Sequence, residues 1–223
     1  MVDFSIQRLN MVESQVRPNG VTDARIIAAM GSIPRERFVP EGRRAIAYMD
    51  EEIIIATTPT GRRRYLIEPM VLARLLQLAA LKPTDILLDI GCGTGYSTAV
   101  AAALAESVVA VEENAGLAQI AGETLSELGI ANAAVVQGPH AQGLPSEAPF
   151  DVILINGRVP AVPQALVEQL KPGGRLVAVV GTGPVSRATL VRQTSEGQSS
   201  VSDFDANVPD APGFEIPQQG FVF

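Results

Sequence analysis

The chain is poor in the residues that build disulfides and zinc sites. Its 223 residues include one cysteine, Cys92, and one histidine, His140. A single thiol cannot form a disulfide within the chain, and these two residues are too few for a Cys/His zinc site, so we expect no bound metal. The scarcity of cysteine is typical of a reducing compartment, and we therefore predict a cytoplasmic protein.

Long apolar runs and excess positive charge are also missing. No stretch reaches the roughly 18 uninterrupted apolar residues of a membrane span. Residues 1–20 are polar and do not resemble a signal peptide, so we predict no membrane association. The net charge of −7 argues against broad nucleic-acid binding, which needs a basic face.

What is present fits one α/β domain with a modest extra segment, because 47% of the residues are hydrophobic and 18% are charged. Apolar spacing predicts helices over 4–16, 22–33 and 68–81, and a short strand, turn and basic loop over 51–66. From residue 85 strands and helices alternate, which indicates a doubly wound, mostly parallel sheet. Residues 171–174, Lys-Pro-Gly-Gly, predict a turn, and 189–214 predict a hairpin followed by a looser tail. We expect one structural domain, with a helical cap at 1–65 and a core at 66–223.

The stretch DILLDIGCGTGYST, residues 85–98, predicts a strand, a tight loop and a helix. Its glycines stand at 91, 93 and 95, and no lysine follows, which argues against a nucleoside triphosphate site. The spacing also differs from the dinucleotide pattern. Asp89 precedes the glycines, where a carboxylate would repel a pyrophosphate and would suit a cationic ligand. S-adenosylmethionine carries an ammonium and a sulfonium group and no phosphate.

A second acid, Glu112, ends the next predicted strand, about 20 residues beyond the loop, where it can accept hydrogen bonds from both ribose hydroxyls. Together, Asp89, the glycine loop and Glu112 predict binding of S-adenosylmethionine and of its product S-adenosylhomocysteine, without metal. An ordinary tight turn followed by a surface acid is the competing interpretation. Cys92 is interpreted as a small loop residue, and Tyr96 as a packing residue. The residues that we assign to the cofactor are Asp89, Gly91, Cys92, Gly93, Thr94, Gly95, Glu112, Glu113, Gly138, Pro139 and Asn156.

Three longer stretches resemble the protein-L-isoaspartate O-methyltransferase family. They are IPRERFVPEGRRAIAYMDEEIII, EPMVLARLLQLAALKPTDILLDIGCGTGYSTAVAA and PFDVILINGRVPAVPQALVEQLKPGGRLVAVVG. The resemblance implies a seven-stranded, Rossmann-like class I methyltransferase fold with an N-terminal helical cap. It also implies methyl transfer from S-adenosylmethionine to the carboxylate of an isoaspartyl residue in damaged protein, a repair reaction. A carboxylate is already nucleophilic, so holding it in line with the sulfonium would supply most of the rate.

The chain departs from this family in two places. The family has Thr-Ile-Ser-x-Pro before a helix, with the serine at the reaction centre, whereas this chain has Ile67, then Glu68 and Pro69. The family has Gly-Asp-Gly where this chain has Gly138, Pro139 and His140, so the aspartate that would hold the adenine amino group is replaced. We predict that His140 is a solvated loop residue, although stacking on a ligand is the other possibility. Because isoleucine offers no hydrogen bond, we expect isoaspartyl methylation to be weak or absent and cofactor binding to be intact.

The basic run Arg62, Arg63, Arg64 and the adjacent Tyr65 allow two interpretations. Most short charge runs are solvated turns, but arginine forks also suit a substrate carboxylate, so we assign these residues to the substrate side. Glu68 is either a helix N-terminal acid or a neighbour of the sulfonium. The function alternatives are isoaspartyl repair, methylation of another acceptor on the same scaffold, and a non-catalytic S-adenosylmethionine-binding module. We expect a monomer or a weak homodimer.

Overall fold

The computed structural model describes residues 3–58, 60–195 and 197–214. A seven-stranded sheet in the order β5-β4-β3-β6-β7-β8-β9 forms its centre, and a separate two-stranded sheet pairs β1 with β2. Neighbouring strands from β5 to β7 are parallel, and β8 and β9 are added antiparallel at one edge. The strands are β1 Ile53–Thr57, β2 Arg63–Leu66, β3 Ile86–Ile90, β4 Ser107–Glu112, β5 Ala133–Gln137, β6 Phe150–Val159, β7 Leu170–Val180, β8 Arg187–Thr194 and β9 Gly197–Asp205. This confirms the predicted fold class.

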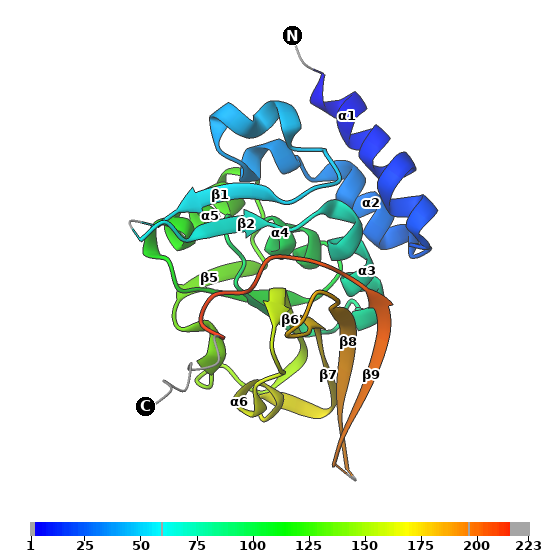
Figure 1. Ribbon diagram of the computed structural model, residues 1–223, viewed down its shortest axis with the longest axis vertical. Coiled ribbons are helices and arrows are strands. Elements are labelled where there is room, and N and C mark those ends of the chain that lie inside the picture. The colour runs from blue at the N-terminus through cyan, green and yellow to red at the C-terminus, as the bar shows by residue number, and fades with distance from the viewer. Residues whose placement is uncertain (1–2, 59, 196, 215–223) are drawn as a thin grey trace.

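Helices cover both faces of this sheet, and the N-terminal helices lie above its upper edge in Figure 1. Helix α3 packs on β6 and β7, whereas α4 and α5 pack on β4. The helices are α1 Phe4–Met11, α2 Ala24–Ser32, α3 Pro69–Ala79, α4 Tyr96–Ala102, α5 Ala115–Glu127 and α6 Gln164–Val167. A π-helical turn, Val12–Val16, continues α1, and short 3-10 turns include Arg35–Phe38 and Glu41–Ile46.

Successive residues of the central strand face opposite sides of the sheet, as a β-strand requires. On β3, Leu87 belongs to the hydrophobic cluster that also holds the cap, α3 and α4, whereas Leu88 belongs to the cluster that holds α6 and the C-terminal Phe214. Both residues are fully buried. The first cluster includes residues on both sides of position 65, in line with one structural domain; the division at that residue stays a prediction.

Two local predictions need correction. The segment expected as a basic loop forms strand β2, because Leu66 and Tyr65 pair with Ile53 and Ile54 of β1. The turn expected at 171–174 is a bulge inside β7: Phe150 of β6 pairs with Leu170, but Val152 pairs with Arg175. The intervening residues are therefore looped out of the ladder without ending the strand.

Candidate active site

The predicted cofactor residues gather where the carboxyl ends of β3, β4 and β6 meet, which is where open α/β sheets bind ligands. The loop after β3 turns tightly because Gly91, Gly93 and Gly95 have φ values of 71°, 59° and 96°. Glycine adopts this left-handed region without the penalty that a Cβ brings. The amide N–H of Gly93 donates to Oε2 of Glu112 at 2.9 Å, so the glycine loop and the end of β4 are joined directly.

Asp89, at the end of β3, is fully buried and holds this loop in place. Its Oδ2 accepts hydrogen bonds from the hydroxyls of Ser97 at 2.8 Å and Thr98 at 2.6 Å, and its Oδ1 accepts from Nδ2 of Asn156 at 2.5 Å. Burial raises the pKa of Asp89 to about 6, while these three donors act in the opposite direction. The carboxylate therefore links β3, α4 and β6 beneath the candidate cofactor site.

Glu112, also fully buried, is the acid on which the contacts of the site converge. Besides the Gly93 amide, its Oε2 accepts from Nη2 of Arg64 at 2.8 Å, and its Oε1 accepts from the Asn114 amide at 3.0 Å. The His140 ring lies 3.7 Å away. Burial opposes the charge of Glu112, but the Arg64 guanidinium and the Asn114 amide favour the charged form, and the pKa of Glu112 is lowered. The acid is thus held as a carboxylate.

His140 is buried and joins the end of β4 to the C-terminal segment, which corrects the prediction of a solvated loop residue. Its side chain is fully buried. Its Nε2 accepts from the Glu113 amide at 3.0 Å, and its Nδ1 lies 2.9 Å from the carbonyl oxygen of Pro212, to which it donates in the neutral tautomer that these partners require. The ring of Phe214 stacks on it at a centroid distance of 6.4 Å. The imidazole is buried because the C-terminal segment folds back over it.

That C-terminal segment, residues 206–214, crosses the carboxyl ends of the strands and was predicted as a loose tail. The Arg158 amide donates to Pro209 at 2.9 Å, and the Ala211 amide donates to Arg158 at 2.8 Å. Gly157, with a φ of 123°, permits this approach: a Cβ there would lie 3.0 Å from Ala211 atoms. Figure 1 shows the segment in red, running from β9 across the sheet.

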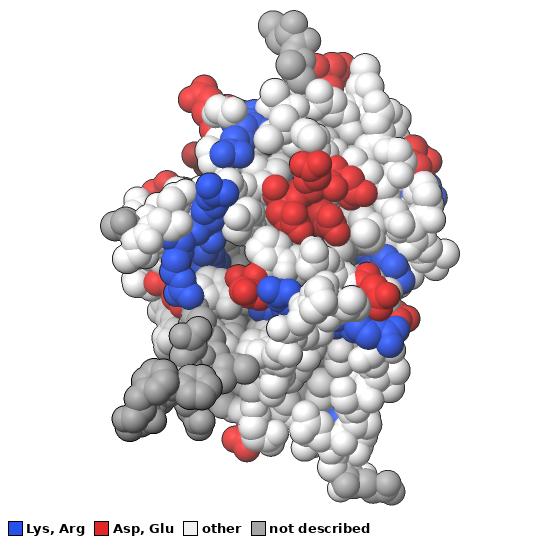
Figure 2. Space-filling model, viewed as in Figure 1, with Lys and Arg blue, Asp and Glu red and all other residues white. Residues whose placement is uncertain are grey.

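The β1–β2 hairpin covers the site from the other side. Cδ1 of Ile55 would lie 2.6 Å from a Cβ placed on Gly93, so the hairpin packs directly on the glycine loop. A cavity of about 320 Å³ lies between the hairpin and the C-terminal segment; its lining includes Arg62, Arg63, Arg64, Tyr65, Glu113 and Pro209. Figure 2 shows basic side chains over the turn end of the hairpin and an acidic patch over its other end.

Within the basic run the three arginines differ. Arg64 is 6% exposed and pairs with Glu112, whereas Arg62 and Arg63 are exposed. Two arginines of the run are thus exposed and the third is buried against Glu112. The assignment of the run to a substrate carboxylate stays a prediction. Tyr65 is half-buried and lines the cavity.

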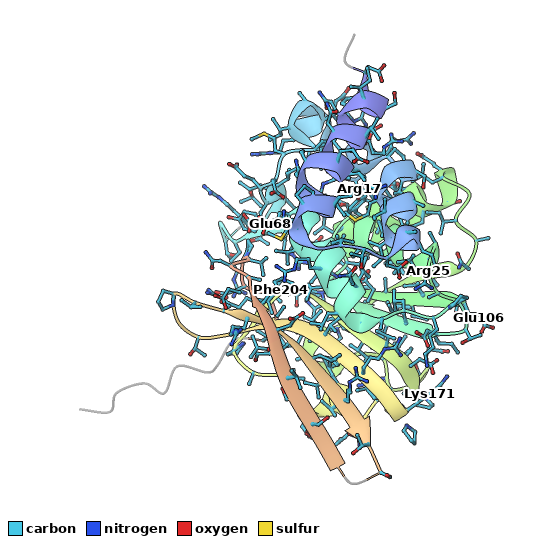
Figure 3. All side chains as sticks on the ribbon, turned by 90° about the vertical axis from the view of Figure 1, so that its right-hand side faces the viewer. Arg17, Arg25, Glu68, Glu106, Lys171 and Phe204 are labelled. Atoms are coloured by element: carbon cyan, nitrogen blue, oxygen red, sulfur yellow. The ribbon has the colours of Figure 1, made fainter. Side chains whose placement is uncertain are left out.

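Ile67 and Glu68 lie between β2 and α3, at the rim of the site. Ile67 is buried and lines a small pocket together with Arg64 and Asn156. Glu68 is half-buried at the N-cap of α3, and burial, with Glu52 and Asp50 nearby, raises its pKa to about 7. In Figure 3 Glu68 lies on the opposite side of the molecule from Glu106 and Lys171, which precede or begin strands. Glu68 is therefore on the side of the carboxyl ends.

The remaining predicted residues have mainly structural contacts. Cys92 is buried, and desolvation raises the pKa of its thiol well above the ordinary value, as befits a small loop residue. The Thr94 hydroxyl donates to the Phe38 carbonyl at 2.5 Å and so joins the loop to the cap. The amide of Gly138 donates to the backbone carbonyl of Glu112 at 3.1 Å, and Pro139 precedes the turn that carries His140. No group of three His, Cys, Asp or Glu side chains suited to a metal occurs among the described residues.

The sequence matches a known protein family over most of its length. Residues 7–208 match the family described as protein-L-isoaspartate(D-aspartate) O-methyltransferase. The chain belongs to this family. It is 39% identical over 193 residues to the protein-L-isoaspartate O-methyltransferase of Koribacter versatilis, covering 86% of this chain and 85% of that one. It is 38% identical over 206 residues to that of Herpetosiphon aurantiacus, covering 92% and 89%. The resemblance inferred from the motifs is confirmed.

Solved structures of the protein-L-isoaspartate O-methyltransferase family agree with the fold. One shares 26% identity with a TM-score of 0.80, covering 93% of this chain and 67% of that one. A second, described as a putative family member from Plasmodium falciparum in complex with S-adenosylhomocysteine, shares 19% identity with a TM-score of 0.76, covering 92% and 98%. The second likeness concerns the fold alone.

The residues present fit the nucleoside cofactor of this methyltransferase family in their donor and acceptor chemistry. The buried carboxylate of Glu112 lies beside the glycine loop, and its usable lone pairs suit a ribose diol. One buried donor beside it, Nη1 of Arg64, has no hydrogen-bond partner among the described residues. Such an orphaned donor next to a cavity points to a site that is completed by a ligand.

No helix in the described part of the chain is long and apolar enough to cross a membrane.

Proposed function

We propose that the chain is a protein-L-isoaspartate O-methyltransferase that methylates the free carboxylate of an isoaspartyl residue in damaged protein. The observation that carries the proposal is the joined pair of glycine loop and Glu112 at the carboxyl ends of β3 and β4, in a chain of this family. When bound, S-adenosylmethionine supplies a methyl group on a positively charged sulfur.

On the cofactor side, the residues of this chain bind and orient. Glu112 accepts the ribose hydroxyls, the Gly91–Gly95 loop allows close approach of the nucleoside, and Asp89 keeps the loop in position through Ser97 and Asn156. Glu113, Gly138 and Pro139 border the base. His140 stands where the family has its second glycine, and its hydrogen bonds to Glu113 and Pro212 hold the residues beside the base in place.

On the substrate side, the basic face of the hairpin recognises the isoaspartyl carboxylate. Arg62 and Arg63 are exposed around the cavity, and Arg64, which is buried against Glu112, also lines it. The guanidinium forks and Tyr65 hold the carboxylate oxygen in line with the methyl carbon. The new C–O bond forms as the C–S bond breaks, and no proton needs to move, because the nucleophile is already ionised.

The test is methyl transfer from radiolabelled S-adenosylmethionine to an isoaspartyl peptide and to its normal aspartyl counterpart. We expect base-labile methyl ester on the isoaspartyl peptide alone, at a rate limited by Ile67. Transfer to a different acceptor in preference to both peptides, or cofactor binding without any transfer, would contradict the proposal. A cytoplasmic location and a monomeric or weakly dimeric state remain predictions.

A further inference from the structure

We propose that Arg64 is a positioning residue with two alternative partners, so that cofactor binding prepares the substrate site. Without cofactor, Arg64 neutralises Glu112. When ribose hydroxyls take its place on Glu112, the guanidinium turns to the incoming carboxylate. The inference rests on the proposed function and adds an order of binding, cofactor first, that the family membership does not supply.

The first observation is that Arg64 is bound to the carboxylate of Glu112, which the proposed function assigns to the ribose. Of the Glu112 oxygens, Oε1 accepts the Asn114 amide and Oε2 accepts both the Gly93 amide and Nη2 of Arg64. The two amides belong to the backbone of the site itself. The contact made by a side chain from outside the core sheet is the one from Arg64, so it is the contact that a ligand can replace.

The second observation is that Arg64 is incompletely satisfied in this position. The residue is 6% exposed, and its Nη1 is buried without a hydrogen-bond partner, 3.7 Å from Oε1 of Glu113. A buried guanidinium donor without a hydrogen bond costs free energy, which lowers the net free-energy cost of exchanging partners. The same side chain lines both pockets between the hairpin and the C-terminal segment. A carboxylate there could satisfy both nitrogens of the fork.

The third observation is that Arg64 belongs to a hairpin that is joined to the central sheet by side-chain contacts and not by backbone pairing. Strands β1 and β2 form their own two-stranded sheet and make no ladder with the central one. The hairpin contacts the glycine loop through Ile55 and the end of β4 through Arg64. Both contacts are made to residues that the proposed function assigns to the cofactor, so a change at the cofactor site acts directly on the hairpin.

The experiment measures binding of S-adenosylhomocysteine by calorimetry, with the wild-type chain and with Arg64→Leu and Arg64→Gln. Because Arg64→Leu removes the competing cation, its affinity for S-adenosylhomocysteine should be about tenfold higher than that of the wild type, within the usual range of coupling between ligands. Arg64→Gln retains a donor without charge, so its affinity should lie between those of the wild type and Arg64→Leu. Arg192→Leu removes an exposed arginine on β8 and serves as the charge control, with unchanged affinity.

A second titration gives the coupling itself. S-adenosylhomocysteine should raise the affinity of the wild-type chain for an isoaspartyl peptide, and Arg64→Leu should abolish this increase. Product affinity that is equal or weaker in Arg64→Leu, with no coupling in the wild type, would overturn the role of Arg64 and leave the proposed function intact. Failure of every variant to bind S-adenosylhomocysteine would overturn both.

Discussion

Replacement of Arg35 should destabilise the chain although the residue touches neither ligand. Arg35 is fully buried in the Pro-Arg-Glu-Arg-Phe-Val stretch. Its Nε donates to the Ala47 carbonyl at 2.8 Å and its Nη2 donates to the Ile67 carbonyl at 2.7 Å, while the guanidinium lies 4.7 Å from the Tyr96 ring centroid. One side chain thus ties the cap to the loop that precedes α3.

The magnitude follows from those contacts. Arg35→Met leaves the two carbonyls without their charged donor, at a cost of about 1–3 kcal/mol each, and removes the cation–π contact. It also removes a buried charge, whose desolvation opposes the folded state. Burial lowers the pKa of Arg35, in keeping with that opposing cost. We therefore expect a net loss of about 2–4 kcal/mol.

Urea denaturation of Arg35→Met, with Arg37→Met as a matched control, measures this effect. Arg37 belongs to the same stretch but is exposed, and its ion pair with the exposed Glu127 should contribute about 0–1 kcal/mol. Equal losses in the two variants, or a loss below about 0.5 kcal/mol in Arg35→Met, would refute the argument that Arg35 joins the cap to the site.

Three further outcomes are expected. Gly93→Ala should lose about 1–3 kcal/mol in urea denaturation, because its φ is 59° and its Cβ would lie 2.6 Å from Ile55; Gly183→Ala, which has open space, is the control, and equal stability of the two would contradict this. Ile67→Ser should raise the initial rate of isoaspartyl methylation at saturating cofactor, and an unchanged or lower rate would count against the role given to this position. Burial raises the pKa of Glu68 to about 7, so the folded chain binds this proton more tightly than the unfolded chain. Stability should therefore fall as pH rises from the ordinary carboxyl pKa, roughly 4.3, toward 7, and Glu68→Gln should flatten this fall in denaturations across that range.

Features encoded by adjacent residues were predictable from the sequence. The strand, glycine loop and helix at 85–98 depend on local apolar runs and on backbone conformations that glycine favours. Glu112 follows one crossover later, and its spacing places it at the neighbouring strand end. Such signals can be read from a single sequence, so the fold and the position of Glu112 could be predicted.

Features that depend on contacts between distant segments were not. His140 is buried because Pro212 and Phe214, more than seventy residues later, fold over it. Arg64 reaches Glu112 across 48 positions, and nothing in a run of three arginines distinguishes the one that enters the core. Gly157 gives a weak signal, since a glycine inside strand β6 indicates that another part of the backbone comes close, but not which segment does so.

The most direct test of the account locates the methyl group that the chain transfers. A peptide that contains one isoaspartyl and one aspartyl residue is incubated with S-adenosylmethionine and the wild-type chain, and tandem mass spectrometry assigns the modified residue. We predict a methyl ester on the isoaspartyl carboxylate, absent from the aspartyl residue and strongly reduced with Glu112→Ala. An ester on the aspartyl residue, or none on either while S-adenosylhomocysteine binds normally, would contradict the proposed function.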